Sequence, residues 1–426
     1  MSDTTIKSVI GRSVWDSRGR PTVEADVILV DGSVGRAIAP AGASTGSGEA
    51  LDLRDGSSAF GGFGVSGAVA NVNRDIATAL LGKDASDQAG CDAQLVDLDG
   101  TPDRSRLGGN AMIATSMALA HATARSRRLP LWQSVQTSRQ SVMPVPEIQI
   151  FGGGAHASGQ MDLQDFMIVP FGADSFRQAT EWVAEVYLAA GSIMRSAGMA
   201  CGVADEGGYW PSFPGNESAI EALVKAIELA GFSVTDQIGL SLDIAASQFF
   251  RDGKYVLKRE GRQLSSQEWF AQLADWMHSY PIKMIEDPFD ESDFESHAAF
   301  TSAFGTQAQI VGDDLLVTKL ARIDTAAQAK ACNTLLCKPN QVGTLSEART
   351  AFERSRALGW NCVLSARSGE TEDVTIAHLA VGWGVRQFKV GSFSRSERMA
   401  KWNEMLRIEE ALGKSARYAG AEVFGH

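Results

Sequence analysis

Six charged side chains recur through the second half of this 426-residue chain, each closing a short apolar run. They are Asp243, Glu286, Asp313, Lys338, Arg367 and Lys389. After the first, wider gap they lie 22 to 29 residues apart, close to the roughly 30 residues that one strand and one helix occupy in a barrel. Buried parallel strands are nearly continuous apolar runs, and barrel enzymes carry their chemistry at the C-terminal strand ends. The pattern therefore predicts that three carboxylates, two lysines and an arginine converge on one mouth.

A simpler interpretation is that each charge ends a strand and meets water. Contact with water would explain one such residue. Six at a regular spacing, with the carboxylates preceding the basic residues, favour a shared functional site. Carboxylates without soft ligands suit a hard cation such as Mg²⁺.

The composition bounds the class of protein. The chain is 44% hydrophobic and 21% charged, as in ordinary globular proteins, and its length allows a barrel plus one smaller domain. A net charge of −12 argues against nonspecific nucleic-acid binding and against an anionic membrane surface. It leaves room for a small anionic substrate, because a site can be locally basic.

The sequence favours a cytoplasmic location. No apolar run approaches the length that spans a bilayer, and the first residues lack the pattern of a signal peptide. The cysteines are odd in number, form no CxxC pair and mostly lie in apolar runs, so we expect buried free thiols. They are Cys91, Cys201, Cys332, Cys337 and Cys362.

The order of patterns predicts two domains. Residues 4–39 alternate in three runs, with Asp31-Gly32 as a hairpin turn, and helical periodicity dominates residues 65–128. We therefore expect an α+β capping domain over residues 1–137. Strands and helices then alternate, which predicts a mainly parallel (β/α) barrel with outer helices over residues 138–426. The small-residue loop 40–46 is either a surface connection or a lid with glycine hinges.

Several motifs in order give the chain a family resemblance. They are Asp16-Ser-Arg-Gly-Arg-Pro-Thr-Val-Glu24, Gly42-Ala-Ser-Thr-Gly46, Leu53-Arg-Asp-Gly56, Gly153-Gly-Ala-His-Ala157, Asp205-Glu-Gly-Gly208, Ile285-Glu-Asp-Pro288, Gly312-Asp-Asp-Leu315, Lys338-Pro-Asn-Gln-Val-Gly-Thr344, Ser368-Gly-Glu-Thr-Glu-Asp373 and Ser394-Arg-Ser-Glu-Arg398. The chain resembles enolase over essentially its whole length. The resemblance implies an α/β fold with an enolase-type modified TIM barrel behind an N-terminal α+β domain. It also implies a homodimer or higher homo-oligomer and two Mg²⁺ ions, the second bound with substrate.

The resemblance also implies a reaction and roles. The family removes a proton α to a carboxylate and expels a β-hydroxyl, with a lysine or histidine base beside Mg²⁺. Lys338 is then the base, Glu206 assists departure of the hydroxyl, and Lys389 binds the substrate carboxylate. The implied Mg²⁺ ligands are Asp243, Glu286 and Asp313, with Ser44 for the second ion. The implied substrate-binding residues are Ala43, His156, Gln164, Asp165, Arg367, Ser368 and Lys389. A neutral base requires a lowered pKa, which we expect Lys389 and the cations to provide.

Four positions depart from the usual pattern of the family. Ala366 replaces a histidine, Asp165 a glutamate and Gly152 an asparagine, and Gly48 stands where a larger residue usually precedes Glu49. Drift in a housekeeping enolase of glycolysis is one interpretation. The expectation we favour is a bulkier phosphonate substrate, as in carboxyphosphonoenolpyruvate synthase of phosphonate natural-product and antibiotic biosynthesis. A pseudoenzyme that serves as a binding protein is a third alternative, which the retained base and carboxylates disfavour.

Overall fold

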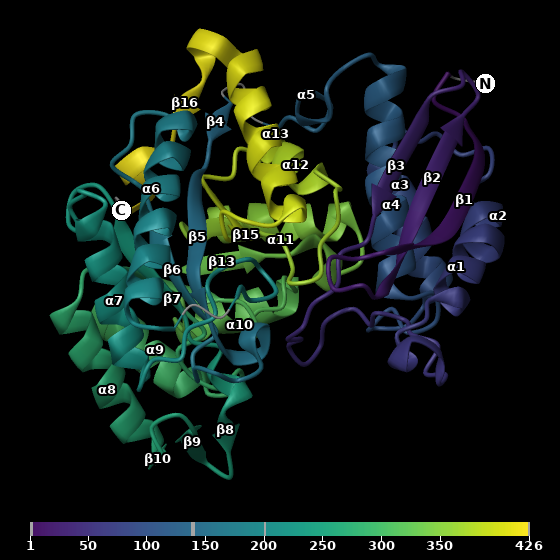
Figure 1. Cartoon of the computed structure of the whole chain (residues 1–426). Helices are drawn as coiled ribbons and strands as arrows, with labels where there is room; N and C mark the ends of the chain where they lie inside the picture. Colours follow the sequence, from purple (N-terminus) through teal and green to yellow (C-terminus); the bar gives the residue numbers. More distant parts are fainter. Residues whose placement is uncertain (1–2, 138–140, 200–201, 425–426) are drawn as a thin grey trace.

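A computed structural model describes residues 3–137, 141–199 and 202–424, and it has two parts (Figure 1). The N-terminal part is built on an antiparallel sheet in the order β1-β2-β3, with bounds Ile6–Trp15, Pro21–Leu29 and Val34–Ile38. The predicted turn at Asp31-Gly32 connects β2 to β3. The predicted three-strand meander is therefore present.

Helices cover one face of this sheet. The alanine-rich helix α4 packs on β2 and β3 and is buried along nearly its whole length, because small side chains allow close approach of helix and sheet. The helices α1, α3 and α5 contact α4, and α2 packs on β1 and α3. The bounds are α1 Ser66–Asn71, α2 Ala77–Leu80, α3 Gln88–Asp99, α4 Gly109–Ser126 and α5 Leu131–Ser134.

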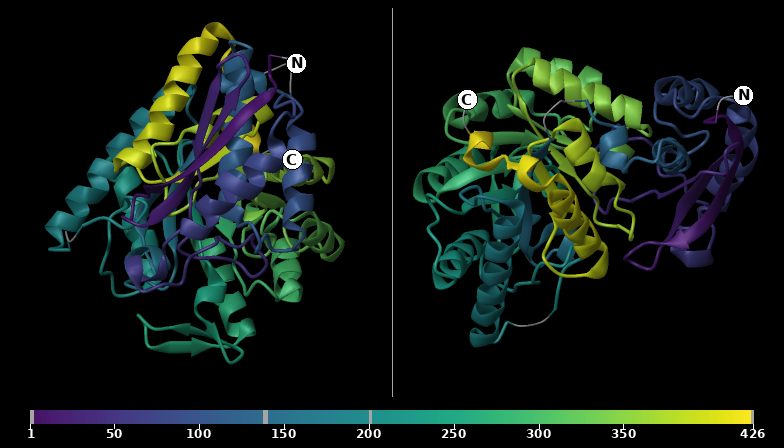
Figure 2. Two further views of the ribbon diagram at one scale, coloured as in Figure 1. Left: turned by 90° about the vertical axis from the view of Figure 1, so that its right-hand side faces the viewer. Right: turned by 90° about the horizontal axis from the view of Figure 1, so that it is seen from above.

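The second part is a closed eight-stranded barrel in the order β11-β12-β13-β14-β15-β5-β6-β7. Viewed from above, its helices form an outer layer with the N-terminal part to one side (Figure 2). The strands are β5 Val145–Gly152, β6 Asp165–Val169, β7 Gly239–Asp243, β11 Ile282–Glu286, β12 Gln309–Gly312, β13 Thr334–Cys337, β14 Asn361–Ser365 and β15 Gln387–Gly391. The helices are α6 Phe176–Ser196, α7 Asn216–Leu229, α8 Ser266–Ser279, α9 Phe294–Phe304, α10 Leu320–Ala329, α11 Leu345–Ala357, α12 Thr375–Trp383 and α13 Ser396–Leu412.

One barrel strand runs against the others. The strand β6 is antiparallel to both β5 and β7, whereas the remaining neighbours are parallel. Its first residue, Asp165, therefore pairs with Asp243 at the end of β7. The N-terminal end of β6 thus lies at the same mouth of the barrel as the C-terminal ends of the parallel strands.

Apolar side chains fill the opposite end of the barrel. Val145, Val169, Met284 and Leu336 form part of a buried cluster there, which Val423 near the C-terminus joins. Five short strands of the second part lie outside the barrel sheet. The sheet β8-β9-β10 has bounds Phe250–Arg251, Lys254–Leu257 and Arg262–Leu264, and β4 Val142–Met143 pairs with β16 Arg417–Tyr418.

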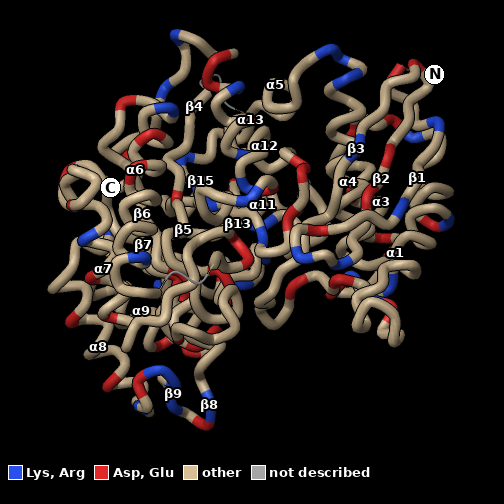
Figure 3. Tube along the Cα trace, in the orientation of Figure 1, with Lys and Arg blue, Asp and Glu red and all other residues tan. Residues whose placement is uncertain are grey.

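The predicted domain boundary falls at residues 137 and 138, and residues 138–140 lie outside the described part. Within the described residues, every helix is too short or too polar to cross a bilayer. The described cysteines are buried free thiols, as predicted, and Cys201 lies outside the described residues. Acidic and basic residues are interspersed over both parts of the molecule (Figure 3).

Candidate active site

A small cavity at the barrel mouth is lined mainly by residues singled out from the sequence. It is lined by Ser44, His156, Gln164, Glu206, Asp243, Lys338, Ser365, Ala366, Arg367, Ser368 and Lys389. Asp165, Glu286 and Asp313 touch lining residues directly. Ala43 reaches the site through its backbone, whose N–H donates to Ser368 Oγ at 2.6 Å. The structure thus gathers all the predicted residues in one place.

The lysines lie between the carboxylates rather than apart from them. Lys389 Nζ donates to Asp243 Oδ2 at 2.9 Å and to Glu286 Oε2 at 2.7 Å. Lys338 Nζ donates to Asp313 Oδ2. Each lysine is therefore paired with carboxylates of the mouth, whereas Arg367 pairs with Glu49, outside the six.

The mouth carboxylates supply oxygen donors for a hard divalent cation, and the oxygens of Asp287, Asp313 and Asp314 already lie within 4.8 Å of one another. Glu286 Oε1 is buried and has no hydrogen-bond partner in the described part of the chain, although a buried carboxylate oxygen requires one. Burial raises the pKa of Glu286, and the Asp243 charge raises it further. A cation would satisfy the free oxygen and offset this repulsion. Oxygen is the donor type that Mg²⁺ prefers.

The protein groups around Lys338 do not by themselves lower its pKa, so the expected lowering would depend on the bound cations. Burial lowers the pKa of the ammonium, but the adjoining Asp313 carboxylate raises it, and the net direction is upward. The expectation placed Lys389 close enough to act by repulsion. In the structure Lys389 is neutralised by Asp243 and Glu286, so its repulsion is outweighed.

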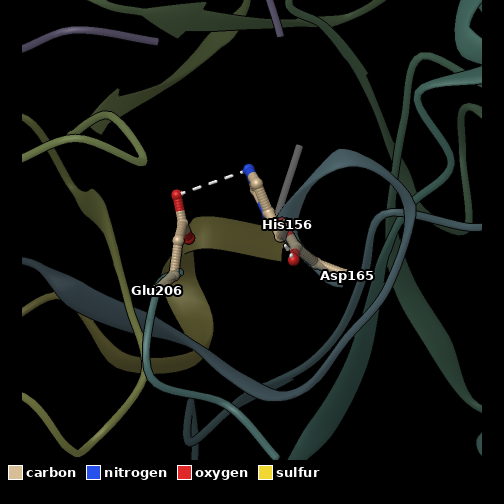
Figure 4. Close-up of side chains that lie close together, drawn as sticks. All are labelled: His156, Asp165 and Glu206. Carbon is tan, nitrogen blue, oxygen red and sulfur yellow. Dashed lines mark hydrogen bonds and ion pairs between the residues drawn. The ribbon is translucent and has the colours of Figure 1, made fainter. Parts of the chain in front are cut away.

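A second cluster joins His156, Asp165 and Glu206 (Figure 4). His156 lies on the short helix η3 (Gly154–Ala157), and its Nδ1 is 2.9 Å from Asp165 Oδ1. Its Nε2 points toward Glu206, with Oε1 at 3.7 Å. Burial lowers the pKa of His156, but Asp165 and Glu206 raise it to about 9.

Gln149 is hydrogen-bonded to Asp165. Its amide donates to Asp165 Oδ1, and its Oε1 accepts from the N–H of Gly208 at 2.8 Å. Gln149 thus bridges Asp165 and the loop that carries Glu206. The sequence analysis did not identify Gln149, which lies in β5.

Two further polar residues that the analysis missed hold site backbone in place. Arg398 is fully buried and donates to the carbonyls of Arg367, Val390 and Ser368 at 2.6, 2.8 and 2.5 Å. Asp287 accepts from the N–H groups of Asp313 and Asp314 at 3.0 and 2.6 Å. Asp287 and Arg398 both lie inside motifs that carry the family resemblance. Their presence in those motifs is the sequence signal that could have identified them.

Two larger cavities, of about 390 and 540 Å³, lie between the N-terminal helices and barrel helices. They contain none of the predicted site residues. A further cavity of about 310 Å³ lies beside the mouth and shares Arg367 with it.

Comparison with known proteins agrees with this geometry. The family model described as "Enolase, N-terminal domain" matches residues 6–135, and "Enolase, C-terminal TIM barrel domain" matches residues 140–426. The chain is 47% identical over 427 aligned positions to "Enolase 1" of Desulfitobacterium hafniense (strain Y51), covering 100% of this chain and 98% of the relative.

The expectation of a carboxyphosphonoenolpyruvate synthase is wrong. Full-length 47% identity to a curated enolase supports the housekeeping alternative instead, and phosphonate and antibiotic biosynthesis have no support. The expected open space beside Arg367 is also absent, because the mouth cavity that Ala366 lines measures only about 10 Å³. Glu49, which follows Gly48, lies against Arg367.

Proposed function

Because this chain belongs to the enolase family and is a hydro-lyase with a small phosphate-containing substrate, we propose that it converts 2-phosphoglycerate to phosphoenolpyruvate in glycolysis. The observation that carries the proposal is the mouth cavity, where Lys338, Glu206, Lys389 and Arg367 line one space. These groups supply a base, an acid and two anion-binding cations. Dehydration of a phosphorylated hydroxy acid needs all of them at once.

The roles follow from the chemistry of each group. We propose that neutral Lys338 takes the α-proton, that the β-carbon–oxygen bond then breaks, and that protonated Glu206 gives its proton to the leaving hydroxide to form water. Lys389 would bind the substrate carboxylate. His156, Gln164 and Asp165 would border the hydroxyl end.

The phosphate would be held by Arg367, Ser368 and the Ala43 backbone. The proposed ligands of the tighter Mg²⁺ are Asp243, Glu286 and Asp313, and Ser44 belongs to a second ion. Bound metal supplies positive charge that stabilises the carboxylate dianion formed by proton loss. A cation held by Asp313 would weaken the hold of this carboxylate on the Lys338 proton and would favour the neutral amine.

We also propose a homodimer or higher oligomer, in the cytoplasm, with residues 1–137 capping a catalytic barrel over 138–426. Large apolar side chains on the N-terminal part support association. Trp15 and Phe60 are 58% and 60% exposed, and their rings pack edge to face at 5.5 Å. Exposed aromatic pairs of this kind are enriched at protein interfaces.

The test is turnover of 2-phosphoglycerate with Mg²⁺, followed by the absorbance of the enol product. We expect kcat/KM within the ordinary range of enzymes, roughly 10⁴–10⁸ M⁻¹s⁻¹. The Lys338→Ala variant is the control for contaminating activity. A folded wild type with no Mg²⁺-dependent turnover would refute the proposed reaction and leave a binding protein as the alternative.

A further inference from the structure

Glu49 lies against the arginine that the proposed function assigns to the substrate phosphate. Its Oε2 accepts from Arg367 Nη1 at 2.9 Å, and its Oε1 accepts from Nη2 at 3.2 Å. The Glu49 and Arg367 side chains are 8% and 3% exposed. A buried bidentate pair fixes the plane of the guanidinium as well as its position.

The pair leaves one edge of Arg367 available. Nη1 also donates to Asn340 Oδ1 at 3.1 Å, and Nη2 also donates to the carbonyl of Ser44 at 3.0 Å. Four of the five N–H donors of a guanidinium are thereby used within the described residues, and Nε–H remains. Ser368 Oγ accepts from the N–H of Ala43, so its own proton is also available for an anion.

Glu49 also ties the loop over the site to this arginine. Its Oε1 accepts from the backbone N–H of Gly46 at 3.0 Å. The loop fits closely here, since a Cβ on Gly42 would lie 2.1 Å from Arg367 Nη2 and one on Gly46 would lie 2.6 Å from Val317. Gly48 has φ +101°, a conformation that glycine adopts without strain. The turn that brings Glu49 inward therefore depends on Gly48.

The same carboxylate connects to the carboxylate network. Gln341 Nε2 lies 3.3 Å from Glu49 Oε1 and 2.9 Å from Asp313 Oδ1, donating toward both. Gln341 Oε1 accepts from Thr318 Oγ1 at 2.6 Å, which fixes the orientation of the amide. The loop, the anion-binding arginine and Asp313 thus share one hydrogen-bonded chain.

We propose that Glu49 is a positioning residue that holds Arg367 with its Nε edge open to the substrate phosphate while the loop covers the site. Glu49 does not touch the reacting atoms. It acts by making closure of loop 40–49 and orientation of Arg367 a single event. The proposal rests on the proposed function for the identity of the anion.

The test compares Glu49→Gln with Glu291→Gln. Glu49→Gln keeps the size of the side chain but removes the charge and one acceptor. Glu291 is the matched control, because its carboxylate accepts from the N–H of Ser47 at 3.0 Å and so anchors the same loop without contacting Arg367. The measurements are KM and kcat for 2-phosphoglycerate, and the affinity for inorganic phosphate by calorimetry with Mg²⁺ present.

We expect Glu49→Gln to raise KM and the dissociation constant for inorganic phosphate by a similar factor, about 10 to 100, with a smaller change in kcat. Glu291→Gln should change phosphate affinity less than about threefold. Glu49→Asp, which keeps the charge one methylene short, should lie between wild type and Glu49→Gln.

Unchanged phosphate affinity in both Glu49 variants would overturn the proposal, and so would an equal loss in Glu291→Gln, because loosening of the loop would then suffice. Phosphate binding is measured without turnover. An absence of 2-phosphoglycerate turnover in the wild type would therefore refute the proposed function. The phosphate affinities of the variants would still test the role of Glu49.

Discussion

His297 makes the barrel sensitive to acid. His297 lies on α9 and is fully buried. Its Nε2 donates to the carbonyl of Phe289 at 3.3 Å. Phe289 is three residues after the proposed metal ligand Glu286. The Nδ1 of His297 is buried and has no hydrogen-bond partner in the described part of the chain. Burial lowers the pKa of His297 to about 4. The folded protein therefore holds the neutral form.

The size of the effect follows from linkage. An unfolded histidine has a pKa near 6.5, so as the pH falls below that value the unfolded chain takes up a proton that the native protein refuses. Native stability is then lost progressively down to the folded pKa of about 4. Between pH 7 and pH 5 this one group lowers the free energy of unfolding by about 2 kcal/mol.

The perturbation is His297→Gln, whose amide can still donate to Phe289 but does not titrate. Urea unfolding of wild type and variant at pH 7 and pH 5 gives the four free energies needed. We expect the wild type to lose about 2 kcal/mol more than the variant over this interval. Every other titrating group, including His378, cancels in the difference. An equal pH dependence of the two proteins would refute the assignment of a buried neutral histidine.

Three further predictions concern the site. Lys338→Ala should abolish exchange of the substrate α-proton with D₂O, followed by NMR, and normal exchange would show that another group is the base. Asp243→Asn should weaken Mg²⁺ binding at least about tenfold by calorimetry, because one of three anionic ligands is lost, and unchanged affinity would remove Asp243 from the ligand set. Arg398→Lys, which cannot reach three carbonyls with one ammonium, should lower the free energy of unfolding in urea by about 3 kcal/mol and raise KM by loosening Arg367 and Ser368. A loss below about 1 kcal/mol would mean that the fork of Arg398 is dispensable.

The barrel and the membership of its mouth could be predicted from the sequence because strand ends have a regular period. Asp243 and Glu286 are the last residues of β7 and β11, and Asp313 and Lys338 directly follow β12 and β13. Apolar runs of this kind give strand position but not strand direction. The reversal of β6 was therefore not predicted, although it determines how Asp165 reaches the site.

The pairing of charges within the site could not be predicted in the same way. The regular spacing of the strand ends places Lys389 at the mouth. Whether Lys389 repels Lys338 or binds Asp243 depends on the side-chain directions across the barrel. The partnership of Glu49 with Arg367 joins residues more than 300 positions apart. No local sequence pattern predicts such a contact. In the sequence, Gly48 indicates only the loss of a larger side chain, and its positive φ is visible only in the structure.

The barrel closes by pairing β15 with β5, so that Gln387 lies opposite Val145 and Lys389 opposite Glu147. During synthesis β5 emerges long before its partner, and one edge of it stays unpaired until residues near 391 have left the ribosome. Unpaired edges of apolar strands are prone to intermolecular pairing, and such long-range contacts form slowly. We therefore expect nascent chains that end before β15 to be the aggregation-prone and chaperone-dependent species.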